Sequence, residues 1–148
     1  MSQDAVFGWI NGIAIAGWLA LLLGPLIPEL SQRLAAVICP LLLALGYVAV
    51  IGWSLGGGDG GGSAPDFTTL DGVAAIFSTR TAVLAGWAHY LAFDLFVGAW
   101  EARDARRRGL AHVVLIPALV LTFLSGPLGF LVYHALTRAL ASRPVAAA

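Results

Sequence analysis

The stretch "GWAHYLAFDLFVGAW", residues 86–100, decides the class of fold, because it is apolar enough to cross a membrane and yet contains His89, Tyr90 and Asp94. Its length approaches the roughly 20 helical residues that span a bilayer. A carboxylate in the middle of a membrane helix costs about 2.5–3.5 kcal/mol on insertion scales, so such residues mark functional sites by default. The stretch therefore predicts a membrane helix and a candidate site on it.

The composition of the whole chain agrees with a lipid environment. Of the 148 residues, 59% are hydrophobic and only 11% are charged, whereas soluble domains average about 25% charged residues. The 8 basic residues balance the 8 acidic residues. This zero net charge argues against a nucleic-acid-binding protein, which needs a basic face. The first apolar run follows no Lys or Arg, so we expect no cleaved signal peptide.

Four apolar segments are long enough to cross a bilayer as helices: about 5–26, 34–55, 81–100 and 113–136. Membrane spans are helices or closed barrels, because lipid cannot satisfy backbone polar groups, and these segments are longer than barrel strands. The sequence therefore predicts an all-α polytopic membrane protein, in which residues 1–148 form a single domain with four transmembrane helices in a bundle.

Two connecting segments have a distinctive composition. Segment 54–67 is rich in Gly and predicts a flexible loop. Segment 68–80 is too short to span, but its apolar residues have helical spacing. We expect it to form a short interfacial helix before the third span, with Thr69 as its N-cap. Within the fourth predicted span, the pair Gly126-Pro127 is expected to kink the helix.

The distribution of arginine predicts the orientation in the membrane. Four spans place the first and third connections on one side of the membrane. The second connection and both termini lie on the opposite side. The first group holds Arg33, Arg103, Arg106, Arg107 and Arg108, and the second holds Arg80, Arg138 and Arg143. The positive-inside rule assigns the larger group to the cytoplasm. We predict a multi-pass protein of the cell membrane, with loop 101–112 cytoplasmic and both termini on the periplasmic or outer side.

Helical phase divides the polar residues of the third span between two faces. At about 100° per residue, Asp94 shares a stripe with polar, aromatic and small residues that should face the bundle interior. These are Trp87, Tyr90, Gly98 and Glu101. His89 lies about 140° away from Asp94, so we expect no direct hydrogen bond between them on a straight helix. It aligns instead with Phe93, Phe96 and Trp100. Asn11 in the first span is a candidate partner for one of the two.

Several kinds of chemistry lack their sequence motifs. The three histidines are too few and too widely spaced for di-iron histidine boxes, and the single Cys39 offers no cysteine pair for zinc. No P-loop, dinucleotide fingerprint or G-x-S-x-G motif is found. We therefore expect no metal and no cofactor. Acid/base chemistry, proton handling and binding of an apolar ligand remain as alternatives.

Two motifs carry a resemblance to a known family: "GWAHYLAFDLFVG", residues 86–98, which a basic run follows, and "LTFLSGPLGFLVY", residues 121–133. On these motifs the chain resembles the bacterial branch of the abscisic-acid-deficient-four-like proteins, over residues 71–138 above all. The plant members are chloroplast-envelope proteins needed to make neoxanthin from violaxanthin. The resemblance implies a neoxanthin-synthase-like integral membrane protein.

The resemblance also implies a reaction: a cofactor-independent isomerase opens the epoxide of a carotenoid or other isoprenoid to an allenic alcohol. An acid protonates the epoxide oxygen, and a base removes a proton from the adjacent polyene carbon. Asp94 and His89 are the expected catalytic acid and base. The remaining residues are expected to contact the substrate: Trp87, Tyr90, Phe93, Trp100, Glu101 and Asn11.

A second function is compatible with the same residues. They would orient the polar end groups of a carotenoid or lipid without catalysis, in a membrane accessory protein. A proton-linked transporter is less attractive, since four short spans without inverted repeats do not suit a monomeric transporter. The expected partners are an apolar isoprenoid ligand and membrane lipids. Whether the chain forms a homo-oligomer is left open.

Overall fold

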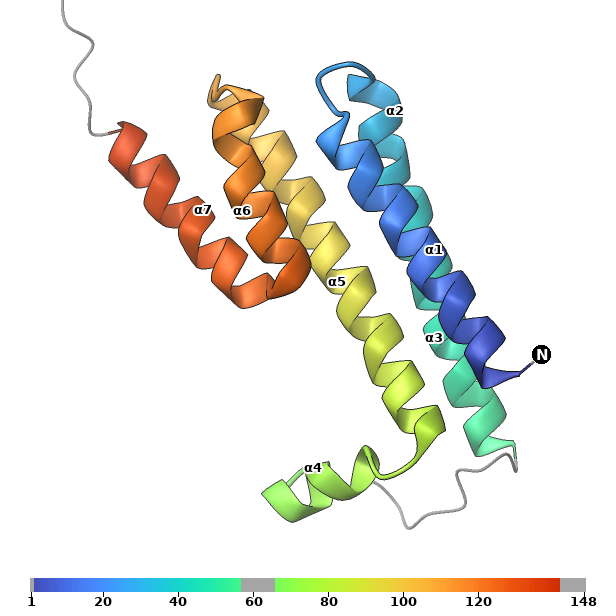
Figure 1. The fold of residues 1–148 in the computed structure, drawn as a ribbon. Helices are drawn as coiled ribbons and strands as arrows, with labels where there is room; N and C mark the ends of the chain where they lie inside the picture. Colours follow the sequence, from blue (N-terminus) through green and yellow to red (C-terminus); the bar gives the residue numbers. More distant parts are fainter. Residues whose placement is uncertain (1, 57–65, 142–148) are drawn as a thin grey trace, which may run out of the picture. The chain divides into compact units, whose positions relative to one another are not determined.

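The computed structural model describes residues 2–56 and 66–141, and all regular elements in these ranges are helical (Figure 1). This confirms the prediction of an all-α fold. The predicted Gly-rich loop lies largely outside the described residues. The elements are α1 (Gln3–Leu22), α2 (Pro28–Arg33), the π-helical segment η1 (Leu34–Ile38), α3 (Cys39–Leu55), α4 (Leu70–Ile76), α5 (Arg80–Arg107), α6 (His112–Leu124) and α7 (Gly126–Ala141).

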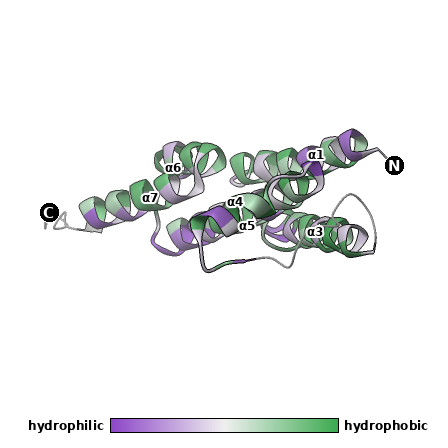
Figure 2. Ribbon diagram, turned by 90° about the horizontal axis from the view of Figure 1, so that it is seen from below, coloured by the Kyte–Doolittle hydropathy of each residue, from purple (hydrophilic) through white to green (hydrophobic). Residues whose placement is uncertain are grey.

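Three helical segments among the described residues are long and apolar enough to cross a membrane: Gln3–Leu22, Pro28–Leu55 and Arg80–Arg107. They correspond to the first three predicted spans. Figure 2 shows hydrophobic residues along most of α1, α3 and α6. Large apolar side chains on these helices are exposed, among them Trp9 at 68% and Leu45 at 65%. Such surfaces would be unfavourable in water and suit contact with lipid.

The second long helical segment changes its hydrogen bonding part-way along. It begins at Pro28, a position in the first turn where the missing N–H of proline has no cost. The π-helical segment Leu34–Ile38 comes shortly before Pro40. Because proline lacks an N–H and its ring crowds the carbonyl four residues earlier, the preceding turn cannot keep regular α-helical bonding.

The fourth predicted span is not one helix, and this prediction is wrong. α6 ends at Leu124, and Ser125 has φ −162° and ψ 83°, which are not helical values. α7 begins at Gly126, and Pro127 fits its first turn because an N–H is not required there. The predicted kink is therefore a complete break, and α6 and α7 form a helical hairpin. The count of four spans is not confirmed.

The predicted short helix before the third span is present as α4, and its N-cap is confirmed. Thr69 Oγ1 accepts a hydrogen bond from the Gly72 backbone N–H at 3.0 Å. Just before the helix, the Asp66 carboxylate accepts from the hydroxyl of Thr68 at 2.6 Å and from its backbone N–H at 2.8 Å. These hydrogen bonds lower the pKa of Asp66. The interfacial location of α4 stays a prediction.

The chain falls into two compact units. The first unit contains the described parts of Met1–Ala16 and Ile38–Phe93, and the second contains those of Gly17–Val37 and Asp94–Ala148. The boundary in α5 thus lies just before Asp94. The residues predicted to form the site divide between the two units.

Candidate functional site

Asp94, in the second unit, packs against the first residue of α7. Its side chain is buried, with 9% exposed. A Cβ atom added to Gly126 would lie 2.8 Å from the Asp94 Cγ and even closer to Oδ1. Only glycine therefore allows this approach. The start of a helix carries the positive end of its macrodipole, which stabilises a nearby negative charge. The location of Asp94 thus gives a physical reason for a carboxyl group in an apolar segment.

Glu101 lies two turns after Asp94 on α5 and is fully buried, with 0% exposed. The Thr122 hydroxyl on α6 donates to the carboxylate and lies 3.0 Å from Oε1 and 3.1 Å from Oε2. Asp94 is near enough for the two carboxyl groups to interact electrostatically. Buried carboxyl groups are costly unless hydrogen bonds compensate. Asp94, Glu101 and Thr122 therefore form a buried polar group, which we call the carboxyl pair site.

The break between α6 and α7 builds this site. The first turn of α7 lies directly on the last turn of α6, and a Cβ added to Gly129 would overlap the Thr122 backbone. The carbonyl of Ser125 accepts hydrogen bonds from the N–H groups of Leu128 at 2.9 Å and Gly129 at 3.1 Å. The hairpin thus places Thr122 opposite Glu101 and the start of α7 opposite Asp94.

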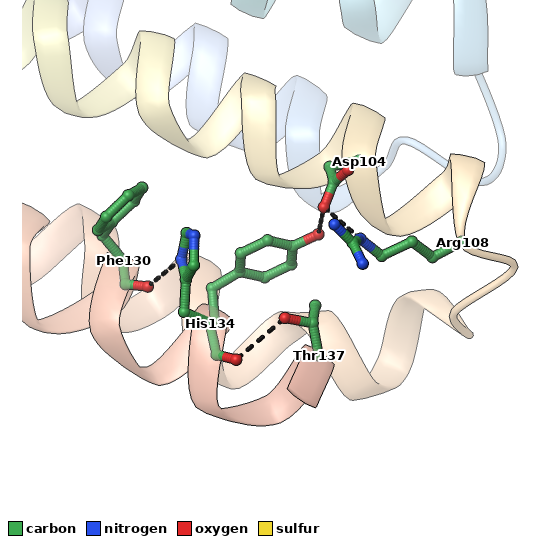
Figure 3. A network of polar contacts seen from close by, with 6 residues as sticks. Asp104, Arg108, Phe130, His134 and Thr137 are labelled. Carbon is green, nitrogen blue, oxygen red and sulfur yellow. Dashed lines mark hydrogen bonds and ion pairs between the residues drawn. The ribbon is translucent and has the colours of Figure 1, made fainter. Parts of the chain in front are cut away.

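A polar network fixes α7 along the C-terminal half of α5 (Figure 3). The Tyr133 hydroxyl donates to Asp104 Oδ2 at 2.7 Å, and Arg108 Nε lies 2.5 Å from the same oxygen. Earlier on α5, the Trp100 ring contacts the rings of Phe130, at 5.8 Å, and Tyr133, at 5.6 Å. These contacts advance together along both helices, so α7 runs parallel to this part of α5.

Trp18 of α1 packs against α5 and α6 in the second unit. A Cβ added to Gly98 would lie 2.6 Å from the Trp18 ring, so this glycine allows α1 and α5 to approach closely. The same ring meets Phe123 edge-on, with centroids 5.5 Å apart. Trp18 is buried. The carboxyl pair site is thus part of a tightly packed group of helices.

His89 belongs to the first unit, where its contacts are with aromatic rings. Its ring centroid lies 4.6 Å from that of Phe93 on the same helix and 5.8 Å from that of Tyr47 on α3. The side chain is exposed, and Phe93 is 59% exposed. His89 is therefore on the surface of its unit.

The predicted ligand-contacting residues of the first unit form a second cluster. The Trp87 Nε1–H donates to Asn11 Oδ1 at 3.2 Å, and the Asn11 amide donates to the Phe7 carbonyl at 2.7 Å. The Trp87 ring stacks on Tyr90, with centroids 5.4 Å apart, and on Phe7, at 6.4 Å. Asn11 therefore bonds to Trp87 and Phe7, whereas the sequence suggested His89 or Asp94 as its partner.

A cavity of about 450 Å³ lies beside this aromatic cluster in the first unit. Phe7, Phe77 and Trp87 form much of its wall. Asp4 and Arg80, which form an ion pair at 2.6 Å, also line it. The cavity has the mixture of aromatic walls and a few polar groups that is typical of sites for small apolar ligands.

A family model described as ABA DEFICIENT 4-like matches residues 5–133, which include both motifs singled out in the sequence. The chain belongs to the ABA DEFICIENT 4-like family. This membership confirms the resemblance and relates the protein to neoxanthin-synthase-like proteins. Assignment to the bacterial branch stays a prediction. Comparisons with curated proteins and with solved structures gave no match.

In this ABA DEFICIENT 4-like protein, the predicted site residues separate into two sets. Asp94, Trp100 and Glu101 lie in the second unit, where Asp94 and Glu101 interact. The first unit holds the others, which are His89, Trp87, Tyr90, Phe93 and Asn11. Among the described residues, no group of three or more His, Cys, Asp or Glu side chains is arranged to hold a metal ion.

Sequence reasoning missed the residues with which the hairpin completes the site. Thr122, Gly126 and Gly129 all lie in the motif "LTFLSGPLGFLVY", which carries the family resemblance but which the sequence predicts as part of one span. The signal for their role was the combination of two glycines and Pro127 within four residues, which favours a break over a kink. The hydrogen bond from Tyr133 to Asp104 depends on that break, and no sequence motif indicates it.

Proposed function

We propose that this family member is an isomerase of the cell membrane, crossing it several times, that opens an epoxide of a carotenoid or related isoprenoid by acid/base catalysis. One observation supports the proposal above all: two buried carboxyl groups, Asp94 and Glu101, lie two turns apart on one face of α5 and pack against the α6/α7 hairpin. Two carboxyl groups in different surroundings are a recurring basis for acid/base catalysis. Family membership supplies the class of substrate.

The reaction conserves all atoms and requires no net oxidation. A proton is transferred to the epoxide oxygen as one carbon–oxygen bond breaks, which leaves an alcohol and a developing carbocation. A base removes a proton from the adjacent polyene carbon, and the electron pair of that carbon–hydrogen bond completes the allene. The protein has to supply a proton donor and a proton acceptor in an apolar site.

We assign the donor role to Asp94. When Asp94 gives up its proton, the carboxylate that forms lies at the start of α7, where the helix macrodipole stabilises it. Proton transfer to the substrate is thereby favoured as the reaction proceeds. A protonated carboxyl group is also the form that an apolar segment accommodates at the lower cost.

Two groups are candidates for the acceptor. His89 is the base expected from the sequence, whereas Glu101 shares a buried site with Asp94. The Thr122 hydroxyl holds the Glu101 carboxylate in place and leaves it able to accept a proton. We therefore favour Glu101 as the acceptor, and we assign His89 to contact with the ligand.

The test is conversion by the protein itself. Purified protein, reconstituted in lipid vesicles, is incubated with a 5,6-epoxy carotenoid, and the pigments are separated by chromatography. We expect a product of unchanged mass with a shortened conjugated system and an allenic stretching band. Unchanged substrate, with the protein folded and the pigment bound, would contradict an isomerase.

A second candidate function is binding of a carotenoid or lipid without catalysis. The aromatic cavity in the first unit favours it, because this cavity includes neither carboxyl group of the pair. The same incubation separates the two functions. Under this second function, pigment co-purifies with the protein in a fixed ratio, Trp87→Ala reduces the amount bound, and no isomer forms.

A further inference from the structure

A second cavity, of about 390 Å³, lies within the second unit, where two connections meet. One connection follows α1, and the other joins α5 to α6 (Figure 1). His112 Nε2 lies 3.2 Å from the Leu22 carbonyl oxygen, and a Cβ on Gly24 would lie 3.6 Å from the His112 ring. The first and third connections of the chain thus lie at the same end of this unit, as the predicted topology requires.

Three side chains that line this cavity can donate hydrogen bonds to a ligand. They belong to Ser31, Gln32 and Arg106, and none of the lining residues is Asp or Glu. Gln32 Oε1 already accepts from Arg103 Nη1 at 3.4 Å, so the amide N–H groups of Gln32 are left to donate. Because the Leu22 carbonyl can only accept, the close Nε2 of His112 carries a hydrogen and is occupied with it.

Arg106 gives the cavity a fixed positive charge. The two ion pairs seen in the described residues are formed by Arg80 and Arg108, so Arg106 is engaged in neither. Its neighbour Arg107 is also exposed but does not line the cavity. A cavity with one guanidinium group, several neutral donors and no carboxylate is complementary to an anion.

The rest of the wall is apolar and comes from Leu21, Pro25, Pro28, Leu110 and Leu115. A site that combines an anion-binding end with apolar walls, at the end of helices suited to a bilayer, fits an amphipathic anion. We propose that this cavity binds the phosphate group of an anionic membrane lipid, with Arg106 as the charged ligand and Ser31 and Gln32 as further donors. The site is separate from the carboxyl pair site and does not depend on the proposed reaction.

The test compares lipid retention by the full chain, purified in a neutral detergent and titrated with phosphatidylglycerol or phosphatidylcholine. Native mass spectrometry counts the lipids bound. We expect one phosphatidylglycerol to bind in preference to phosphatidylcholine. Arg106→Gln should weaken this binding by about tenfold, since one charge-assisted contact to phosphate is lost. Arg107→Gln, the adjacent control with the same change in charge, should bind like the wild type.

Three results would overturn the proposal. The first is equal binding of the two lipids by the wild type. The second is an equal loss in Arg106→Gln and Arg107→Gln, which would indicate attraction by the basic surface as a whole. The third is competition by millimolar inorganic phosphate with an affinity like that of the lipid, which would assign the cavity to free phosphate. Should Arg106→Gln not accumulate, Ser31→Ala tests the same cavity and is expected to weaken the binding severalfold.

Discussion

The two units of the chain use their polar residues in opposite ways. In the first unit, Trp87 and His89 lie on the surface, and their partners are rings and an amide. In the second unit, Asp94 and Glu101 are buried, and they pack against the hairpin of α6 and α7. A single long helix, α5, contributes to both units. The comparison shows that the second unit buries its acidic side chains, whereas the first unit places its aromatic and polar side chains at the surface.

The largest effect on stability is expected at a glycine of the hairpin in the second unit. Gly129→Ala places a Cβ atom against the Thr122 backbone, which cannot move without opening the hairpin. We expect a loss of about 1–3 kcal/mol in the free energy of unfolding, as for other overpacked positions. The measurement is thermal unfolding in detergent, together with accumulation in the membrane.

Gly12→Ala in α1 is the matched control in the first unit. A Cβ at Gly12 meets nothing within 4 Å, so the better helix propensity of Ala should leave stability unchanged or raise it by up to about 1 kcal/mol. Equal losses in the two variants would show that the hairpin is not as closely packed as described.

The next largest effect on stability is expected when one side-chain hydrogen bond is removed from each unit. Thr122→Val keeps the shape of the side chain but removes the hydroxyl that donates to Glu101. Since the buried carboxyl group then lacks this donor, we expect a loss of about 1–3 kcal/mol in stability. Trp87→Phe in the first unit removes a hydrogen bond to Asn11 at an exposed position. It should cost less than about 0.5 kcal/mol. A reversed order of the two unfolding midpoints would contradict the contrast between the units.

The smallest effect is expected for a substitution of His89, and it is measured as the rate of isomerisation. His89→Gln keeps a donor and an acceptor but cannot take up a proton at ordinary pH. Because we favour Glu101 as the acceptor, the rate of isomerisation should stay within about twofold of the wild type. A fall of about 10²-fold or more, with normal accumulation and normal pigment binding, would restore His89 as the base.

The sequence was sufficient for the features that depend on local composition. The first three spans follow from the length of apolar runs, and the N-cap of α4 follows from Thr69 and its spacing to the next turn. Helical phase also placed Asp94 and Glu101 on one face of α5. These properties depend on the residues of a single segment, so they can be predicted without knowing which helix packs against it.

The features that depend on contacts between two segments could not be predicted from the sequence. A run of apolar residues has the same composition whether it is one helix or a hairpin, and the choice was decided at Ser125. Asn11 was expected near His89 or Asp94, but its partners depend on the alignment of α1 with α5, and these proved to be Trp87 and Phe7. Helical phase gives directions around one axis, and it does not give the neighbour found in each direction.

The central claim is that Asp94 donates the proton that opens the epoxide. The most direct test measures product formed and pigment bound, side by side, for the wild type, Asp94→Asn and the exposed control Asp71→Asn. Asparagine keeps the shape and a hydrogen-bond donor but cannot transfer a proton. We predict that Asp94→Asn accumulates and binds pigment like the wild type, with turnover lower by about 10²-fold or more, while Asp71→Asn is unaffected. Undiminished turnover by Asp94→Asn would show that Asp94 is not the proton donor.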